Sequence, residues 1–378
     1  MKFSSRLLVL LFVLSVFIIS GCGADEQAQS TDANENNEKL DIYTTLYPLE
    51  YFANEIGGSH VNIVSILPSG ADAHTYEPTS KTMVDIAGAD AFIFNGAELE
   101  PYADTINEAL KDEDLLSVEA SSGIALSNNM EEQSSEDVHN HAHEEESTET
   151  EHAHEEGEST ETEHAHEEGE STETEHAHEE GESTETEHAH EEEASGETDG
   201  HHHGDVDPHI WLDPIRAISI AENIKNTLIE LKPEAEQEFV TNFENLKSRL
   251  EKLDEEFHSK LESQVNNEIL VTHAAYGYWE QVYGLEQIAI AGISSSDEPS
   301  QKQLENVIDI VKEHGINYLL FEQNVKPKVA SVIQNETNVK SLNIHNLAVL
   351  TDENIENGDD YFTLMYENLD VLVTALKE

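Results

Sequence analysis

A repeat in the middle of the chain, with almost no large apolar side chains, limits how this sequence can fold. EEGESTETEHAH occurs at residues 155–166, 167–178 and 179–190, and a copy one residue shorter, EEESTETEHAH, occurs at 144–154. These copies have no hydrophobic face to stack, so they cannot form a solenoid or bury a core. We predict that the repeat region is disordered. The folded protein must then be built from the sequence on either side of it.

The same region concentrates acid and histidine. Residues 131–207 contain 31 Asp and Glu, 14 of the 21 His, and no Lys or Arg, in a chain of 378 residues with a formal net charge of −63. Such a balance argues against a nucleic-acid binder or electrostatic docking to anionic lipid, and it favours cations as partners. Imidazole suits zinc, copper and nickel, so we interpret the region as a segment that captures metal weakly. A plain solvating acidic linker is the alternative.

Residues 1–21 have the features of a signal peptide, with Lys2 and Arg6 beside an apolar run too short for a comfortable membrane span. The run ends in Ile19-Ser20-Gly21-Cys22, which resembles a bacterial lipobox and implies lipidation of Cys22, the only cysteine. An ordinary signal peptide with an incidental cysteine is the alternative. Residues 22–39 would then be a flexible tether that holds the protein at the outer face of the cell membrane. With its only cysteine lipidated, the chain has no Cys ligand to offer, so any metal must be held by His and carboxylates.

The rest of the chain alternates between strand-like and helix-like segments, which predicts an α/β fold with parallel sheets. The predicted strands are 40–45, 61–66, 91–95, 268–272, 286–291, 317–321 and 340–344. The predicted helices are 48–56, 79–87, 101–110, one that begins at Asp213-Pro214, 274–283, 300–314, 326–335 and 360–376. A charged segment at 233–263 has one apolar stripe, which predicts a long helix that connects two lobes.

We therefore predict two α/β lobes joined by one long rigid helix. The N-terminal lobe spans 40–231 and is interrupted by the disordered insert at 129–206. The linking helix spans 232–263, and the C-terminal lobe spans 264–378. Ligands in such folds bind at the carboxyl ends of the strands, so we expect a site in the cleft between the lobes.

Three of the seven histidines outside the insert follow predicted strands or begin loops: His74, His209 and His273. Taken singly, each of them is best interpreted as a loop histidine held by hydrogen bonds. Three that face one cleft form the pattern of a metal site. We interpret the other four as structural, namely His60, His258, His314 and His345.

The motifs around the three histidines carry a family resemblance. PSGADAHTYEP (68–78), DPHIWLDP (207–214) and THAAYGY (272–278) resemble the zinc and manganese solute-binding lipoproteins of bacterial ABC importers, also described as adhesion-type lipoproteins. The resemblance covers residues 40–127 and 206–376. It implies two lobes bridged by a rigid helix and a metal held by His74, His209 and His273. It also implies a monomeric, non-enzymatic receptor that captures Zn²⁺ and delivers it to a membrane ABC permease.

Other interpretations stay open. Manganese-specific members of this family carry a carboxylate at the third position, so His273 favours zinc, but a manganese receptor and an adhesion lipoprotein are alternatives. Many members place a fourth, carboxylate ligand in the segment that matches 343–351, where Ala348 stands in this chain. The fourth position could then fall to water, Glu77, Asp352 or Glu353, or a histidine of the insert. A zinc hydrolase would need a base such as Glu77, but the chain has no His-Glu-x-x-His motif.

Overall fold

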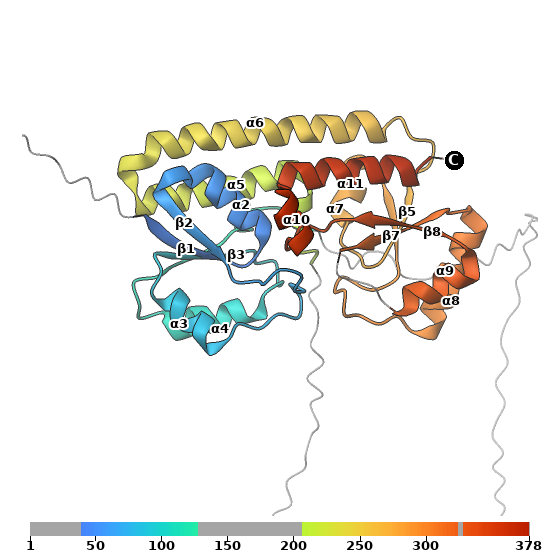
Figure 1. Cartoon of the computed structure of the whole chain (residues 1–378), viewed down its shortest axis with the longest axis horizontal. Coiled ribbons are helices and arrows are strands. Elements are labelled where there is room, and N and C mark those ends of the chain that lie inside the picture. The colour runs from blue at the N-terminus through green and yellow to red at the C-terminus, as the bar shows by residue number, and fades with distance from the viewer. Residues whose placement is uncertain (1–38, 128–205, 324–327, 378) are drawn as a thin grey trace, which may run out of the picture. The chain divides into compact units, whose positions relative to one another are not determined.

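The computed structural model describes residues 39–127, 206–323 and 328–377, which belong to one compact unit with two parallel four-stranded sheets (Figure 1). The predicted α/β class is confirmed. The signal peptide, Cys22, the tether up to residue 38 and the repeats lie outside the described residues, so the predictions about them stay predictions. Among the described residues, no helix has the length and apolar character that a membrane span requires.

The first sheet has the strand order β2-β1-β3-β4, and all of its pairs are parallel. Its strands are β1 (Leu40–Thr44), β2 (Val61–Ser65), β3 (Ala91–Phe94) and β4 (Leu116–Glu119). Its helices are α2 (Tyr47–Gly57), α3 (Ser80–Ala87), α4 (Pro101–Leu110) and α5 (Pro214–Leu231). α2 buries Leu49, Phe52, Ala53 and Ile56, whose spacing places them on one helix face.

The second sheet has the order β6-β5-β7-β8 and is also parallel throughout. Its strands are β5 (Glu268–Val271), β6 (Glu286–Ala289), β7 (Tyr318–Glu322) and β8 (Lys340–Ile344). The helices of this half are α7 (Gly277–Tyr283), α8 (Gln301–His314), α9 (Lys328–Thr337), α10 (Asp352–Asn357) and α11 (Tyr361–Ala375). Ser300 and Gln303 form a capping box that starts α8.

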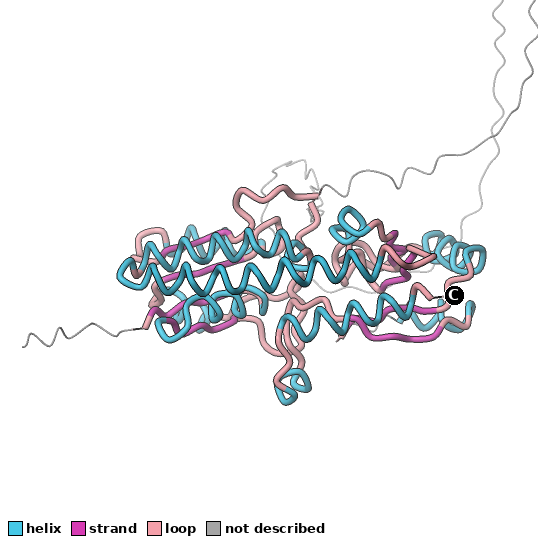
Figure 2. The backbone as a smooth tube through the Cα atoms, turned by 90° about the horizontal axis from the view of Figure 1, so that it is seen from above, coloured by secondary structure: helices cyan, strands magenta, loops and turns pink. Residues whose placement is uncertain are grey.

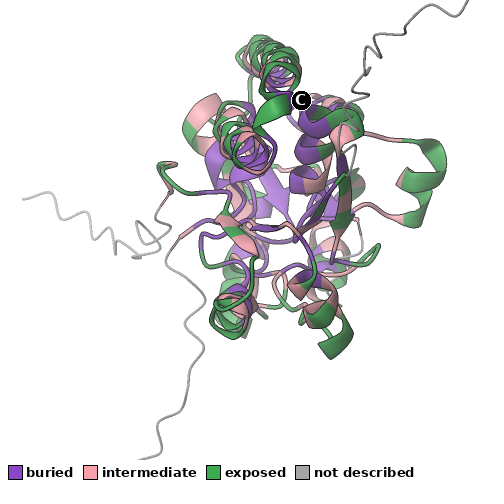
Figure 3. Ribbon diagram, turned by 90° about the vertical axis from the view of Figure 1, so that its left-hand side faces the viewer, coloured by how far each residue is buried: buried purple, intermediate pink, exposed green. Residues whose placement is uncertain are grey.

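The long helix α6 (Glu236–Leu261) packs against α2 and α5 of the first half and against α7 and α11 of the second (Figure 2). A 3₁₀ turn at Pro233–Ala235 precedes it, so the predicted linking segment begins with a different helix type. The buried stripe of α6 joins one hydrophobic cluster that contains side chains from both halves. In the side view of Figure 3, the buried residues lie in the interior, while one side of the long helices is exposed to solvent. The two lobes therefore share a core, and the ends assigned to each domain stay a prediction.

Three local differences from the predicted elements have physical reasons. Strand β4 was not predicted, because its four residues alternate between half-buried and exposed and show no apolar run. Helix α10 was not predicted either, since its six residues include no buried side chain. Helix α7 begins at Gly277 instead of 274, because the backbone after His273 turns back to contact the neighbouring loop, with the N–H of Ala274 donating to the carbonyl of Gly292.

Candidate metal centre

Three loops carry His74, His209 and His273 to one point. His74 lies in the loop after β2, and its backbone N–H donates to Oδ1 of Asp72 at 2.9 Å. His209 immediately precedes the 3₁₀ turn Ile210–Leu212. His273 follows β5, at the carboxyl end of that strand. The structure brings together all three histidines that the sequence singles out.

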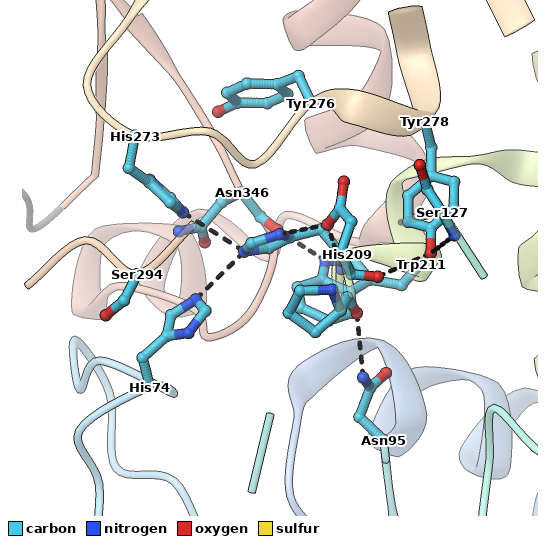
Figure 4. A network of polar contacts seen from close by, with 12 residues as sticks. His74, Asn95, Ser127, His209, Trp211, His273, Tyr276, Tyr278, Ser294 and Asn346 are labelled. Atoms are coloured by element: carbon cyan, nitrogen blue, oxygen red, sulfur yellow. Dashed lines mark hydrogen bonds and ion pairs between the residues drawn. The ribbon is translucent and has the colours of Figure 1, made fainter. Parts of the chain in front are cut away.

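The three imidazole rings point their Nε2 atoms at one another (Figure 4). Nε2 of His209 lies 3.2 Å from Nε2 of His74 and 3.4 Å from Nε2 of His273. One nitrogen from each histidine lies within 4.8 Å of the others, and this is the only such group of three or more candidate ligands in the part of the chain that the structure describes. Tetrahedral zinc with Zn–N bonds of about 2.0–2.1 Å would separate its nitrogen ligands by about 3.3–3.4 Å. The two Nε2 distances match that spacing.

Buried carboxylates lie behind two of the three rings. Oδ1 of Asp207 lies 2.8 Å from Nδ1 of His209 and also accepts the backbone N–H of His209. Oε1 of Glu322 lies 2.6 Å from Nδ1 of His273. Asp207, by accepting from Nδ1–H, leaves the Nε2 lone pair of His209 free to bind a metal, and metal-bound histidines are commonly held in this way. The carboxylate of Glu322 beside Nδ1 of His273 favours a proton at the same ring position.

Burial and neighbouring charges shift the pKa values of these histidines and carboxylates in different directions. Burial lowers the pKa of His209 to about 3 and raises the pKa of Asp207 to about 7. For His273, burial acts to lower the pKa, but the charge and contact of Glu322 outweigh burial and raise it. His209 is therefore neutral and ready to bind a cation near neutral pH, whereas His273 holds a proton more tightly.

The histidines line a cavity of about 70 Å³. That volume is far below the roughly 300–1,000 Å³ of pockets for drug-sized ligands. The other side chains on its wall include Asp72, Trp211, Ser295, Gln323, Asn346 and Ala348. A metal ion with very few additional atoms is the ligand that suits this space.

The cavity wall narrows the alternatives for a fourth protein ligand. Ala348 lines the cavity and offers no ligand atom. Glu77, Asp352 and Glu353 are exposed, and none of them lies on the cavity wall. Asp72 does lie there, with Oδ1 accepting from the His74 backbone and Oδ2 from the Ser295 hydroxyl.

Asp207, Glu322 and Asn346 contribute to the centre but were not singled out from the sequence. The positions of Asp207 and Glu322 in the sequence could have identified them. Asp207 stands two residues before His209, and Glu322 ends β7, the strand that neighbours β5. The carboxyl ends of parallel neighbours meet at one sheet edge, so strand order would have placed Glu322 beside His273.

The remaining described histidines lie away from the cavity. His60, His258 and His314 pair with Glu238, Asp254 and Glu268. His345 is buried, accepts the backbone N–H of Leu347 at Nδ1, and contacts Asn354 through Nε2. Burial lowers the pKa of His345 to about 4. These contacts agree with the structural role expected for the four.

Comparison with known proteins places the chain in a family. A family model described as ZnuA, zinc-uptake complex component A periplasmic, matches residues 42–375. The chain belongs to this family. It is a family of solute-binding receptors and not of enzymes.

Individual relatives resemble the chain over most of its length. The zinc-binding lipoprotein AdcA of Streptococcus pneumoniae R6 is 26% identical over 367 residues, which is 97% of this chain but 60% of AdcA. The high-affinity zinc uptake system protein ZnuA of Bacillus subtilis is 26% identical over 368 residues, 97% of each chain. The crystal structure of the Zn(II)-bound ZnuA-like domain of S. pneumoniae AdcA matches with a TM-score of 0.63 and 24% identity, covering 90% of this chain and 100% of that domain. At this identity, the structural match supports the fold alone.

Proposed function

We propose that this chain is an extracytoplasmic receptor that captures Zn²⁺ and delivers it to a membrane ABC permease. The observation that carries the proposal is the convergence of three histidines, in which Nε2 of His209 lies at zinc-like distances from Nε2 of His74 and of His273, with carboxylates behind His209 and His273. Relatives named for zinc binding and zinc uptake support the same cargo. Zinc is the transported ligand and not a resident cofactor.

The donor set favours zinc over manganese. All three converging ligands are imidazoles, which suit zinc, whereas manganese prefers carboxylate and water oxygens. Among the described residues, Asp72 is the one carboxylate on the cavity wall, and it already accepts hydrogen bonds through both oxygens. A manganese receptor would need further oxygen ligands at this point.

The remaining parts of the chain have roles in the proposal that follow from their sequence. Lipidated Cys22 and the tether would keep a monomeric receptor beside its permease at the outer face of the membrane. The His-rich insert at 129–206 would bind zinc weakly and raise its concentration near the centre.

Calorimetry on the protein without its signal peptide, with zinc and manganese in competition, tests the proposal. We expect one tight site that prefers zinc, plus several weak sites. Changing His74, His209 and His273 together to Ala should abolish the tight site. A control that changes His60, His258 and His314 to Ala should keep it, because those rings lie outside the cavity. A tight site that survives in the first variant would overturn the assignment.

A further inference from the structure

We propose that Asn346 is a positioning residue that couples the two lobes at the metal centre. Its side chain fixes the carboxylate behind His273, while its backbone binds the segment that carries His209. This inference rests on the proposed zinc-receptor function.

The first half of the coupling is a partly buried hydrogen bond to Glu322. Nδ2 of Asn346 donates to Oε2 of Glu322 at 2.8 Å. The other oxygen, Oε1, accepts from the hydroxyl of Thr272 at 3.2 Å and lies 2.6 Å from Nδ1 of His273. Glu322 is 2% exposed, so these groups take the place of solvent around it. Asn346 therefore restricts the carboxylate that faces His273.

The orientation of the Asn346 amide follows from its partners. A carboxylate can only accept, so the NH₂ group must face Glu322. Oδ1 then accepts the backbone N–H of Ala348 at 3.1 Å and Nε2 of Gln323 at 2.8 Å. With two donors on that oxygen, Asn346 lines the cavity as a support for its wall and not as a metal ligand.

The second half of the coupling crosses to the first lobe. The backbone carbonyl of Asn346 accepts the indole N–H of Trp211 at 2.7 Å. Trp211 stands two residues after His209, and its ring centroid lies 5.4 Å from that of His209. Figure 4 shows Asn346 beside His209 and His273. One residue thus contacts the supports of two proposed ligands that come from different lobes.

This arrangement requires a neutral donor at position 346. An Asp there would be nearly the same size but would put a second carboxylate against buried Glu322. Two carboxylates in contact cannot both stay ionised without strong repulsion. The expected result is a displaced Glu322 and a less well oriented His273.

The test compares Asn346→Asp with Asn343→Asp, an exposed asparagine three residues earlier on β8. Zinc affinity is measured by competition with a chelator, and the visible spectrum of the Co²⁺-loaded protein reports ligand geometry. We expect N346D to bind zinc about 10–100-fold more weakly, as for loss of other supports behind metal ligands. Its Co²⁺ spectrum should change, while N343D keeps the wild-type affinity and spectrum.

A charge swap separates positioning from general damage. Glu322→Gln alone should also weaken zinc binding. In the double variant N346D/E322Q, the amide introduced at position 322 can donate to the carboxylate introduced at position 346. The same amide still offers an oxygen to Thr272 and His273, so affinity should rise above that of N346D. Thermal melts without metal show whether each variant is folded.

The outcomes distinguish this inference from the proposed function. An N346D protein that binds zinc as tightly as wild type, or more tightly, would overturn the inference, and tighter binding would indicate that position 346 is itself a ligand position. A double variant that is weaker than N346D would also overturn it. Wild-type protein without any tight zinc site would overturn the proposed function and this inference together.

Discussion

At the metal centre, some side chains are placed to bind the ion and others to orient those ligands. Imidazole nitrogens face the cavity, while the carboxylates of Asp207 and Glu322 lie behind two of the rings and out of reach of a tetrahedral ion at the Nε2 atoms. This division favours zinc, because carboxylates bound directly to the ion would suit harder metals. The orienting residues should therefore affect affinity even though they do not touch the ion.

Asp207→Asn should weaken zinc binding by about 10–100-fold, the usual effect of losing the carboxylate behind a metal-bound histidine. The amide oxygen can keep the backbone contact to His209, but the variant lacks the negative charge that Asp207 carries above its pKa of about 7 and that favours Nδ1–H. Chelator competition measures the change. Asp352→Asn is the matched control, because Asp352 is exposed and lies outside the cavity wall. Equal affinities for D207N and wild type would contradict this role for Asp207.

Zinc affinity should fall as the pH drops through the raised pKa of His273. Zinc binds only neutral imidazole, so a proton on His273 competes with the ion. Above that pKa the affinity should be level, and below it the affinity should fall about tenfold per pH unit for one competing proton. His209, with its pKa lowered to about 3, adds no proton competition at pH 5–8.

Calorimetry at pH 6 in buffers of different ionisation enthalpy should detect the proton released by His273. Glu322→Gln removes the charge that raises this pKa, so the onset of the affinity loss should move to lower pH. An affinity that stays level from pH 7.5 to pH 5 in the wild type would contradict the argument.

Secondary-structure elements determine how much of this fold and site the sequence can reveal. Strands such as β3 and β5 are short apolar runs, which are recognisable because both faces of a parallel sheet are covered. Edge strand β4 alternates between exposed and half-buried residues, and its pairing with β3 depends on contacts that are remote in sequence. Strand ends revealed His74 and His273, whereas the contacts of Asn346 depend on how the loop after β8 folds against β7.

Helix α11 offers a test of local stability away from the centre. Asp360 is its N-cap, with Oδ1 accepting the backbone N–H of Thr363 at 2.7 Å, and it also pairs with Arg249 of α6 at 3.4 Å. Asp360→Ala should lower the free energy of unfolding by about 1 kcal/mol, mostly through loss of the cap. Asp360→Asn should lower it less, because Asn also caps helices and the exposed ion pair contributes little. Urea unfolding of the metal-free protein measures both.

The stability that the Asp360 cap contributes should depend on pH, and the shift of its pKa gives the direction. Burial acts to raise the pKa of Asp360, but hydrogen bonds from Thr363 and Tyr51 and the charge of Arg249 outweigh burial and hold it below the ordinary 3.8. Its contribution to stability is therefore complete above that ordinary value and is lost as the pH falls through the lowered pKa. The difference between wild type and D360A should shrink under strong acid. A difference that grows as the pH falls would contradict this assignment.

On the scale of the whole molecule, the two lobes share a core, and the residues that flank the insert lie beside His209. The larger hydrophobic cluster contains residues of both sheets and of α6, which indicates that the two lobes support each other. The described chain stops at Ser127 and resumes at Val206, and the backbone N–H of Asp207 donates to the carbonyl of Ser127 at 3.0 Å. The Tyr278 hydroxyl accepts from the N–H of Ser127 and donates to the carbonyl of Asp207. The residues that flank the insert, Ser127 and Asp207, are thus in contact with each other beside His209.

Deleting residues 131–204 should therefore leave the fold and the tight zinc site intact. Because Ser127 and Asp207 are already in hydrogen-bonded contact, the few remaining residues need only form a short connection, which folded proteins accommodate readily. Calorimetry should show the same tight affinity and fewer zinc ions bound per chain. Loss of the tight site in a deletion variant that still unfolds cooperatively would show that the insert contributes a ligand.

A second variant separates histidine from acid as the cause of the weak binding. It keeps every Asp and Glu of residues 131–207 and changes the 14 histidines in that range to Gln. The sequence predicts a disordered segment, whose sites would lose conformational entropy on binding a metal. Imidazole suits zinc better than carboxylate does, so carboxylates alone should hold zinc far more weakly than His-Ala-His pairs. The weak sites should disappear from this variant as they do from the deletion. If they persist, the acid itself binds the metal, and the insert acts as a solvating acidic linker that attracts cations only through its charge.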